Sequence, residues 1–417
     1  MTLHESVRET GGHALAAARR MVRLSSAKKN AILLAMAETL NNRRELIKSA
    51  NAADLEQAAA ANLSAAMIDR LTLTDARIGN MVNGIREVAA LPDPVGKRIW
   101  RRVRPNGLVI EKRRVPLGVV AIIYESRPNV TADAAVLCVK TSNAVILRGG
   151  KESLNSNIAI ARALREGGES AGMPKGAVQL IETTDREAVR ELVQMDDRVD
   201  VVIPRGGESL IRAVVQHARV PVLKHYKGVC HIFVDAAADL NRALAITENA
   251  KCQRPGVCNA VETLLVHQDV AQTFLPQLEQ MARRRGVELR GCAKTRQTLP
   301  NCKAAAAADW PAEYLDLILA VKVVKSLKEA IAHINTFGSH HSDAIITEDG
   351  RGAKRFLKEI DSAAVYVNAS TRFTDGGEFG MGAEMGISTD KLHARGPMGL
   401  EELTTYKYLV SGSGQVR

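Results

Sequence analysis

The N-terminal ninety residues carry apolar side chains at helical spacing. Ile32, Met36 and Leu40 recur at every fourth position, after a Ser25–Ser26 pair that can cap a helix. Segment 91–94 contains two prolines, which disfavour a helix because they lack a backbone N–H group. The pattern therefore predicts a helical region that ends near residue 91.

Beyond these prolines, short apolar runs of strand length alternate with helical segments. LGVVAIIY at 117–124, AVILR at 144–148 and VDVVIP at 199–204 are each followed by a segment of helical composition. The alternation resumes at VETLLVH, residues 261–267, and continues to AAVYVN at 363–368. Strands that alternate with helices are typical of parallel sheets. We therefore predict an α/β fold with two Rossmann-like, doubly wound domains.

A strongly basic segment, KRIWRRVRPNGLVIEKRR, lies at 97–114 around an Asn106–Gly107 pair. Because Asn-Gly is a strong signal for a type I′ turn, the segment predicts a β-hairpin. The C-terminal run TTYKYLV, residues 404–410, alternates well enough to pair with it as a small separate sheet. Isolated two-stranded ribbons are marginal, so we expect the two segments to form an intersubunit sheet in a homo-oligomer, at least a dimer.

Composition narrows the class of protein. The chain has 417 residues, of which 46% are hydrophobic, and this is enough for two or three globular domains. The N-terminus lacks an apolar segment, and the longest apolar strand candidate is far shorter than a membrane span. We therefore expect a cytoplasmic protein without membrane contact. The six cysteines lack the spacing of metal ligands, which predicts reduced thiols and no metal site.

The formal net charge of +11 raises the question of nucleic acid. Most of the excess lies in segment 97–114, aromatic residues make up only 3% of the chain, and no zinc-finger, RRM or KH pattern occurs. We therefore favour a solvated or subunit-contacting ribbon, and a basic surface also suits an anionic cofactor and substrate. A non-enzymatic scaffold that binds nucleic acid through this ribbon is the alternative from a different class.

Two Gly-Gly pairs each connect a predicted strand to a predicted helix. Gly149–Gly150 follows Arg148 in AVILRGGKES, and Gly206–Gly207 follows Arg205 in IPRGGESLI. A helix start presents unpaired N–H groups and the positive end of the helix dipole to an anion. Two such turns in adjacent units favour a nucleotide with more than one phosphate, although each pair alone is as often a plain turn. The glycine-rich segment 379–386 is interpreted as a flexible loop near a site.

The stretch QRPGVCNAVETLLVH, residues 253–267, places Cys258 between a Pro-Gly bend and a strand. The bend exposes the cysteine, and backbone N–H groups and Arg254 favour its thiolate, the form that acts as a nucleophile. A small apolar residue that fills a core is the alternative. Cys252, at a helix end, is a weaker candidate for the nucleophile. The other cysteines are interpreted as core residues (Cys138, Cys230) or as residues of polar loops (Cys292, Cys302).

Several long segments occur in the order RRVPLGVVAIIYESRPNVTADAA, KTSNAVILRGGKES, IPRGGESLI, GVCHIFVD, QRPGVCNAVETLLVH, HSDAIITED, VYVNASTRFTDGGEFGMGAE and KLHARGPMGLEELTTYKY. In these segments the chain resembles the aldehyde dehydrogenase superfamily and, within it, the γ-glutamyl phosphate reductase family, also called glutamate-5-semialdehyde dehydrogenases. The resemblance implies an aldehyde dehydrogenase-like fold. It implies NADPH-dependent reduction of L-glutamyl 5-phosphate to L-glutamate 5-semialdehyde and phosphate, through a Cys258 thioester, in proline biosynthesis. Another oxidoreductase of the superfamily, forming free acids, is the closer alternative.

The resemblance also implies roles for individual residues. Asn129 would donate to the oxyanion together with the backbone N–H of Cys258, or it simply makes a turn after Pro128. Cofactor contacts are expected from Arg148, Gly149, Gly150 and Lys151, from Arg205, Gly206 and Gly207 at the pyrophosphate, and from Glu313 at the nicotinamide ribose. Arg148 and Lys151 would favour NADPH through its 2′-phosphate. Substrate contacts are expected from Arg372 (carboxylate), Asp375 (ammonium), Arg127 and Arg254 (leaving phosphate), with ordinary surface contacts as the alternative for each charged residue.

Aldehyde dehydrogenases that form free acids carry a glutamate that activates water. The corresponding segment here is PVLKHYKGVC at 221–230, which has no carboxylate. Three basic residues occur in it instead: Lys224, His225 and Lys227. We therefore expect thioester hydrolysis to be suppressed, unless Glu262 or Glu378 serves as the base from elsewhere in the chain.

These assignments divide the chain into three parts. Residues 1–97 and 115–252 form the predicted cofactor-binding domain, to which 370–396 returns. Residues 253–369 form the catalytic thiol domain, and 98–114 with 397–417 form the oligomerisation ribbon. The expected partners are the small-molecule substrate, further copies of the chain and, as a source of the labile acyl phosphate, a glutamate kinase.

Overall fold

The chain folds into two compact units. The structure is a computed structural model that describes residues 2–417. Unit 1 comprises Met1–Lys224, Gly380–Gly386 and Met398–Arg417, and unit 2 comprises His225–Phe379 and Ile387–Pro397. Within the described residues, no helix is both long enough and apolar enough to cross a membrane. Each unit contains its own parallel sheet.

The helical region predicted at the N-terminus forms five helices of unit 1. They are α1 (Leu3–Met21), α2 (Ser26–Asn42), α3 (Arg44–Ala60), α4 (Ala65–Leu71) and α5 (Asp75–Ala90). Ser25 caps α2, because its hydroxyl accepts a hydrogen bond from the N–H of Lys28. Helix α5 ends at Ala90, just before the proline-containing segment, and packs against α2. The helical prediction is therefore confirmed.

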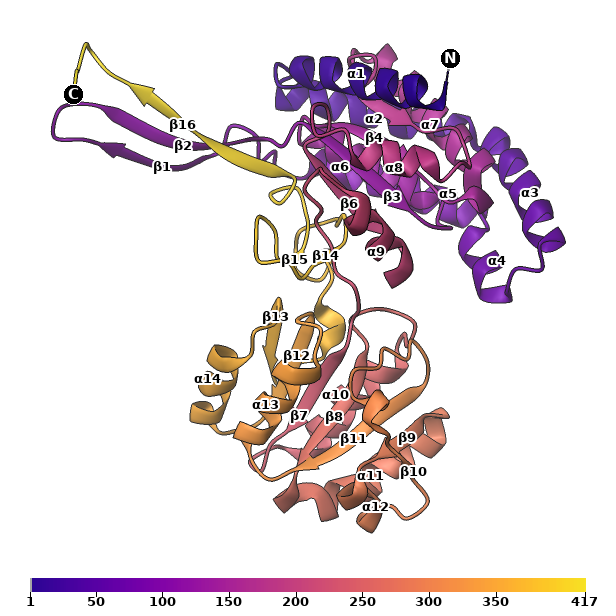
Figure 1. Cartoon of the computed structure of the whole chain (residues 1–417), viewed down its shortest axis with the longest axis vertical. Helices are drawn as coiled ribbons and strands as arrows, with labels where there is room; N and C mark the ends of the chain where they lie inside the picture. Colours follow the sequence, from indigo (N-terminus) through magenta and orange to yellow (C-terminus); the bar gives the residue numbers. More distant parts are fainter. Residues whose placement is uncertain (1) are drawn as a thin grey trace. The chain divides into compact units, whose positions relative to one another are not determined.

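The core of unit 1 is a four-stranded parallel sheet with the order β5-β4-β3-β6. Its strands are β3 (Val119–Tyr124), β4 (Ala144–Arg148), β5 (Val178–Leu180) and β6 (Val201–Arg205). The helices between and after them are α6 (Asn129–Lys140), α7 (Leu154–Ser170), α8 (Glu187–Val193) and α9 (Glu208–His217), with a 3-10 turn at Lys151–Ser153 before α7. Every residue of β3 and β4 is buried, which explains their continuous apolar runs. Because the strands are parallel, both Gly-Gly turns follow strand ends at the same edge of this sheet (Figure 1).

The basic segment and the C-terminal strand form a three-stranded antiparallel ribbon in unit 1. Its strands are β1 (Arg98–Val103), β2 (Val109–Pro116) and β16 (Thr404–Ser411), paired in the order β1-β2-β16. In Figure 1 the ribbon extends outward from the helices of unit 1. The hairpin and the C-terminal strand thus form the small separate sheet that the sequence predicts, with β16 paired to β2 of the same chain. A contact of this sheet with another subunit stays a prediction. A third strand from the same chain makes the ribbon more than an isolated hairpin.

The turn of this hairpin also differs from the predicted type I′ turn. A type I′ turn needs positive φ at both central residues, whereas Gly107 has a φ of 88° and Asn106 is not in the positive-φ region. The strands close over a three-residue loop, in which the N–H of Arg104 donates to the carbonyl of Leu108 at 2.8 Å. Pro105 fixes a negative φ at the first loop position, and this favours the longer turn.

Unit 2 is built on a seven-stranded parallel sheet with the order β10-β9-β11-β8-β7-β12-β13. Its strands are β7 (Cys230–Val234), β8 (Val261–His267), β9 (Glu288–Gly291), β10 (Lys303–Ala304), β11 (Ile318–Val324), β12 (Ser342–Ile346) and β13 (Ala364–Val367). Its helices are α10 (Leu240–Cys252), α11 (Gln268–Arg285), α12 (Ala293–Thr298), α13 (Leu327–Phe337) and α14 (Gly350–Glu359). Leu264 of β8 packs in the cluster that contains Phe274 of α11, and the next residue, Leu265, packs in the cluster that contains Phe356 of α14. Helices therefore cover both faces of the sheet, as a doubly wound fold requires.

The boundary between the units lies earlier in the chain than the sequence predicts. Strand β7 pairs with β8 and β12, so β7 and the following α10 belong to the sheet of unit 2. The structure divides the chain at 224/225, whereas the predicted boundary is 252/253. Of segment 370–396, only Gly380–Gly386 belongs to unit 1. Strand composition cannot reveal this, because the buried strands of two parallel sheets have similar sequences.

Candidate active site

Cys258 lies in unit 2, in the turn between α10 and β8 (residues 253–260, the thiol turn). The turn closes through a hydrogen bond of 3.1 Å from the Ala260 N–H to the Val257 carbonyl. The Cys258 thiol is free and half-buried. It is therefore neither a core residue nor part of a disulfide.

The other cysteines are in different surroundings. Cys138 and Cys230 are fully buried, which confirms their interpretation as core residues. Cys302, predicted in a polar loop, is instead buried in the core of unit 2, and Cys292 packs against the same core. Burial raises the pKa of Cys252, which disfavours its thiolate. Within residues 2–417, no cluster of three His, Cys, Asp or Glu side chains could hold a metal ion.

The segment that leads into β7 holds the backbone of Cys258. A Cβ on Gly228 would lie 2.0 Å from the carbonyl oxygen of Cys258, so this close approach requires glycine. The thiol of Cys230 donates to the same carbonyl at 3.2 Å. The N–H of Gly228 in turn donates to the carboxylate of Glu313 at 2.8 Å. Glu313 is therefore connected to the thiol turn through Gly228.

Charged side chains surround the thiol turn. Arg372 donates through Nε to the side chain of Gln253 at 2.8 Å. Burial lowers the pKa of Arg372, and the positive charge of Arg254 acts in the same direction. The negative charges of Asp375 and of a Cys258 thiolate oppose this lowering. Arg254, Asp375 and Cys258 therefore lie within electrostatic range of Arg372.

Asn259, which the sequence reasoning missed, ties the thiol turn to the loop after β13. This buried side chain donates to the carbonyl of Thr374 at 2.9 Å and accepts a hydrogen bond from Arg372. Its backbone carbonyl accepts from the hydroxyl of Thr371 at 2.7 Å. Asp375 follows in the same loop, with its carboxylate exposed. Asn259 thus fixes the loop that brings Arg372 and Asp375 alongside the thiol turn.

The two carboxylates considered as alternative bases differ in environment. Glu262 on β8 is fully buried and forms an ion pair of 2.6 Å with the buried Lys251 of α10. Burial raises the pKa of Glu262 to about 7, and Lys251 acts in the opposite direction. The N–H of Leu315 also donates to Glu262, at 3.2 Å. Glu378, by contrast, is exposed. The engagement of Glu262 in a buried ion pair argues against its use as a base for water.

In unit 1, the first Gly-Gly turn leads into a helix start that is already capped. The carboxylate of Asp54, on α3, accepts hydrogen bonds from the backbone N–H groups of Asn155 at 3.2 Å and Ser156 at 2.8 Å. It also accepts from both of their side chains, at 2.9 and 2.5 Å. Asp54 is only 1% exposed. Two N–H groups in the first turn of α7 are therefore already paired and are not available to an anion.

Gly149 and Gly150 are instead required by close packing. A Cβ on Gly149 would lie 2.1 Å from the Nδ2 atom of Asn157 and 3.0 Å from the ring of Tyr124. A Cβ on Gly150 would lie 3.2 Å from the backbone nitrogen of Ser126. The first glycine thus permits the approach of α7 to the end of β3.

Arg148 is occupied by backbone carbonyl groups. Its guanidinium donates to the carbonyls of Gly149 at 2.8 Å, Thr184 at 3.1 Å and Asp185 at 3.3 Å. Arg148 is 9% exposed, its buried Nε has no partner, and burial lowers its pKa. Arg148 therefore holds segment 184–185 in place, and its buried Nε–H is a donor without a partner.

The second Gly-Gly turn leads into α9 and is more open. The N–H of Gly207 donates to the carboxylate of Glu125 at 3.1 Å, and Glu125 is exposed. The guanidinium of Arg205 packs against the backbone of Gly386, where a Cβ would lie 2.1 Å from one of its nitrogens. Unlike Asp54, Glu125 is joined to its helix start by a single recorded hydrogen bond.

A cavity of about 690 Å³ in unit 1, the basic cavity, is lined by Gly150 of the first turn and by residues at the start of α9. Arg148, Lys151 and Glu125 line it, together with Ser209 of the first turn of α9. Arg186, just before α8, also lines it and was not found from the sequence. Lys151 and Arg186 are both exposed. A volume of this size is typical of small-molecule sites, and its cations and helix start suit an anionic ligand.

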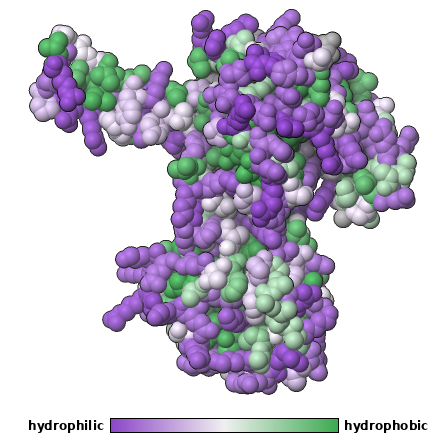
Figure 2. Space-filling view, in the orientation of Figure 1, coloured by the Kyte–Doolittle hydropathy of each residue, from purple (hydrophilic) through white to green (hydrophobic). Residues whose placement is uncertain are grey.

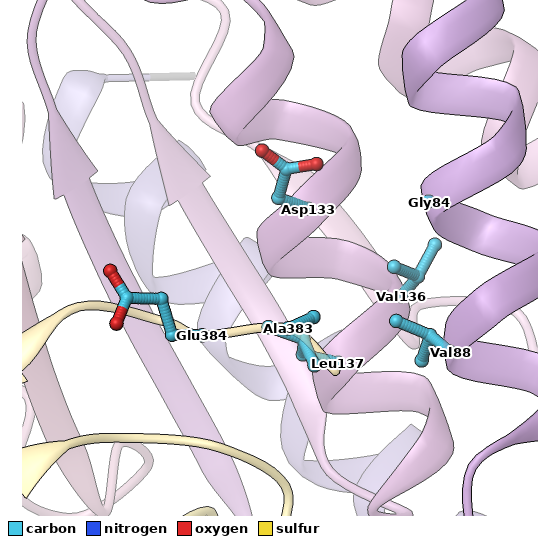
Figure 3. A pocket seen from close by; sticks show the side chains of 7 residues that line it. All are labelled: Gly84, Val88, Asp133, Val136, Leu137, Ala383 and Glu384. Carbon is cyan, nitrogen blue, oxygen red and sulfur yellow. The ribbon is translucent and has the colours of Figure 1, made fainter. Parts of the chain in front are cut away.

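Asn129, at the start of α6 in unit 1, is engaged by a neighbour on its own helix. Its side-chain amide donates to the carboxylate of Asp133 at 2.8 Å. Burial raises the pKa of Asp133 to about 6. Asp133 also lines a second cavity, of about 210 Å³, with Glu384 and apolar residues of α5 and α6 (Figure 3). Arg127 is exposed in the preceding turn.

Known proteins match this chain over its whole length. The profile of the Aldehyde dehydrogenase family matches residues 3–291. The γ-glutamyl phosphate reductases of Geotalea daltonii and Moorella thermoacetica are each 56% identical to the chain, with 100% of both chains covered. The chain belongs to the aldehyde dehydrogenase family. The crystal structure of γ-glutamyl phosphate reductase from Thermotoga maritima is 49% identical, with a TM-score of 0.97 and 99% of each chain covered.

In this member of the aldehyde dehydrogenase family, the candidate residues form two groups. Unit 2 brings Arg254, Arg372, Asp375 and Glu313 around the thiol turn. In unit 1, Arg148 and Lys151 line the basic cavity, and the N–H of Gly207 contacts Glu125, which also lines it. Sequence reasoning missed residues in both groups: Gly228, Cys230 and Asn259 in unit 2, and Asp54, Glu125 and Arg186 in unit 1. The position of Asn259, a polar residue directly after Cys258, is a local signal that could have identified it. Asp54 gives no local signal, because it is 101 residues from Asn155.

Proposed function

We propose that this member of the aldehyde dehydrogenase family reduces L-glutamyl 5-phosphate to L-glutamate 5-semialdehyde and phosphate, with NADPH, in proline biosynthesis. The observation that carries the proposal is a free, half-buried cysteine in a chain that matches two γ-glutamyl phosphate reductases over their full length. Reduction of an acyl phosphate needs such a thiol, because its adduct both forms from an acyl phosphate and releases an aldehyde. We expect the enzyme to work in the cytoplasm, where glutamate kinase would supply its acyl phosphate substrate.

The chemistry begins with attack of the Cys258 thiolate on the γ-carbonyl carbon. The bond from that carbon to the phosphate oxygen breaks, phosphate leaves with the electron pair, and a thioester forms at Sγ. NADPH, when bound, supplies the hydride that reduces this thioester. The resulting thiohemiacetal releases the aldehyde and returns the thiolate. The backbone N–H of Cys258 and the amide of Asn129 are the proposed oxyanion donors, and the latter requires Asn129 to leave Asp133.

The charged groups of the thiol turn suit the substrate. Arg372 would bind the α-carboxylate through its guanidinium fork, and Asp375 would bind the α-ammonium. Arg254 is exposed within electrostatic range of Arg372, and it would hold the leaving phosphate. Arg127 is the second proposed phosphate ligand.

The basic cavity supports a nicotinamide cofactor of the kind that the family uses. The open start of α9 with Gly206 and Gly207 would hold the diphosphate, with Arg205 beside it. Lys151 and Arg186, both exposed in the cavity, would bind the 2′-phosphate and so favour NADPH. Arg148 would act by holding segment 184–185, rather than by the direct ionic contact that the sequence predicts. Glu313 remains the proposed contact of the nicotinamide ribose.

Suppressed hydrolysis of the thioester is part of the proposal. Segment 221–230 has no carboxylate, and Glu262 is held in its ion pair with Lys251. Segment 221–230 therefore offers no general base for water near the thioester, and the cationic surroundings attract phosphate instead. The preferred acyl acceptor in the reverse direction is then phosphate.

We also propose a homo-oligomer in which the ribbon is covered by another subunit. Val103, Tyr408 and Val410 of the ribbon are 58%, 54% and 58% exposed. Figure 2 shows hydrophobic residues interspersed with hydrophilic ones along the ribbon. Exposed apolar side chains beside open strand edges favour contact with a second chain. Light scattering at micromolar concentration should give at least a dimer, and a monomer would contradict this part.

The test is an assay of NADPH consumption with γ-glutamyl phosphate generated by glutamate kinase. Cys258→Ala should abolish turnover, while circular dichroism and NADPH binding stay near wild type, because the thiol makes a covalent bond and little packing. Cys252→Ala removes another half-buried thiol and is the matched control, expected to keep its activity. An active Cys258→Ala enzyme beside an inactive Cys252→Ala enzyme would overturn the assignment.

A further inference from the structure

Glu125 occupies the start of α9 in unit 1. The residue directly follows β3, and its backbone N–H donates to the carbonyl of Arg205 at 3.1 Å, which fixes it beside β6. Its carboxylate accepts the hydrogen bond from the Gly207 N–H at 3.1 Å. A Cβ on Gly206 would lie only 2.6 Å from the carboxyl carbon of Glu125, so the group rests against the turn itself.

This position is one where an external anion would bind. Helix α9 has ten residues, and its N-terminus carries the positive end of the dipole. The start of α9 opens onto the basic cavity, whose lining includes Arg148 with its unpartnered, buried Nε atom. Glu125 itself lines the cavity and is exposed. Its carboxylate therefore occupies the place of an anionic ligand without being locked there.

We propose that Glu125 competes with the cofactor for the start of α9 and thereby sets cofactor affinity. In the empty enzyme the carboxylate rests on Gly207, and the diphosphate of a dinucleotide displaces it on binding. The inference rests on the proposed use of a nicotinamide dinucleotide. Displacement needs only rotation of an exposed side chain, because one hydrogen bond to Gly207 is broken and the diphosphate replaces it.

The competition has a thermodynamic consequence. A site that is open for only a fraction of the time binds its ligand more weakly by that fraction, so Glu125 raises the dissociation constant of the cofactor. The increase applies equally to NADPH and NADH, since the two share the diphosphate. It differs in this respect from any contribution of Lys151 and Arg186, which concerns the 2′-phosphate alone.

Glu152 offers a matched control. Its carboxylate lies in the same cavity, but its recorded partner is the hydroxyl of Ser126 at 3.4 Å rather than the start of α9. Glu152→Gln therefore measures the general effect of removing one negative charge from the cavity. Glu125→Gln removes a charge and the competition together. Glu125→Ala removes the competing side chain altogether and guards against a glutamine that still occupies the helix start.

The experiment measures dissociation constants of NADPH, NADH and inorganic pyrophosphate by calorimetry for the wild type and the three variants. Glu125→Gln and Glu125→Ala should bind both dinucleotides about three- to tenfold more tightly than wild type, and clearly more tightly than Glu152→Gln. The melting temperature of the empty variants should stay level or fall, while its rise on adding NADPH should grow. A purely structural cap would lower the melting temperature and leave the dissociation constants unchanged.

Pyrophosphate separates this inference from the proposed cofactor. If the wild type bound neither dinucleotide, the proposed cofactor would fail, and pyrophosphate alone would decide the role of Glu125. Tighter pyrophosphate binding by both Glu125 variants supports the competition. Unchanged or weaker binding of every ligand by these variants, relative to Glu152→Gln, overturns it.

Discussion

The two Gly-Gly turns of unit 1 share the sequence RGG, in RGGKES and RGGESL, but they lead into different helix starts. At the start of α7, the buried carboxylate of Asp54 accepts hydrogen bonds from the backbone and side chains of Asn155 and Ser156. At the start of α9, an exposed carboxylate, that of Glu125, makes one recorded hydrogen bond beside a large cavity. The motif therefore does not determine whether a helix start can bind phosphate. That property depends on a carboxylate supplied from elsewhere in the fold.

The largest expected effect follows from removing the buried carboxylate. Asp54→Ala should lower the free energy of unfolding by about 3 to 4 kcal/mol, because buried donors at the start of α7 lose their acceptor. Glu125→Ala should lower the free energy of unfolding by less than about 1 kcal/mol, because the Gly207 N–H can then donate to water. Urea unfolding of both variants measures the difference. Equal losses would show that the two helix starts are not distinct.

The glycines of the two turns should also differ. Gly149→Ala places a Cβ 2.1 Å from the side chain of Asn157, and it should cost about 2 kcal/mol of unfolding free energy. Gly207 has a φ of −68°, and its added Cβ would meet nothing closer than Glu125 at 4.0 Å. Gly207→Ala should therefore change stability by less than about 0.5 kcal/mol. Thermal unfolding at one pH tests both, and a larger loss for Gly207→Ala would contradict the packing argument.

The basic side chains that line the basic cavity should determine which cofactor it prefers. Replacing Lys151 and Arg186 together with alanine should weaken NADPH binding about tenfold and NADH binding less than about twofold, because only NADPH carries the 2′-phosphate. Arg148→Ala should weaken both cofactors, since it releases segment 184–185. Fluorescence titration gives the ratios. An unchanged ratio of the two cofactors in the double variant would remove the selectivity role.

The smallest expected effect concerns a third carboxylate of unit 1, Asp133, which accepts from the amide of Asn129 rather than from a helix start. Burial raises its pKa from 3.8 to about 6, so the folded state holds this proton more tightly than the unfolded state. Its contribution to stability is therefore lost as the pH rises from about 4 to about 6. The free energy of unfolding of Asp133→Asn should exceed that of the wild type by about 1 kcal/mol at about pH 8, and the two should be equal at about pH 4. An equal difference at both pH values, measured by thermal unfolding, would rule out this titration.

Local sequence predicts most of the fold, for physical reasons that particular residues show. The serine that caps α2 and the buried runs of β3 and β4 depend on near neighbours, and they appear where the pattern indicates. The Asn106–Gly107 pair alone predicts the wrong turn, because the preceding Pro105 has a fixed φ that favours the longer loop. The membership of β7 in the sheet of unit 2 depends on strand pairing, which composition does not encode.

The candidate sites show the same limit. The bend before Cys258 and the cations near it can be found locally, whereas Gly228 and Glu313 reach the thiol turn only through the fold. The family resemblance implied that Arg148 contacts the 2′-phosphate, but its guanidinium donates to the carbonyls of Gly149 and of segment 184–185. Sequence thus indicates which residue types gather at a site, and tertiary contacts decide which of them remain available to a ligand.

The central claim is that Cys258 forms a thioester whose acyl acceptor is phosphate rather than water. It is tested most directly in the reverse direction, with glutamate 5-semialdehyde and NADP⁺, by following NADPH formation with and without phosphate. We expect steady turnover only when phosphate or arsenate is present, and at most one turnover per active site without them. Sustained NADPH formation in the absence of both anions, with free glutamate as the product, would contradict it.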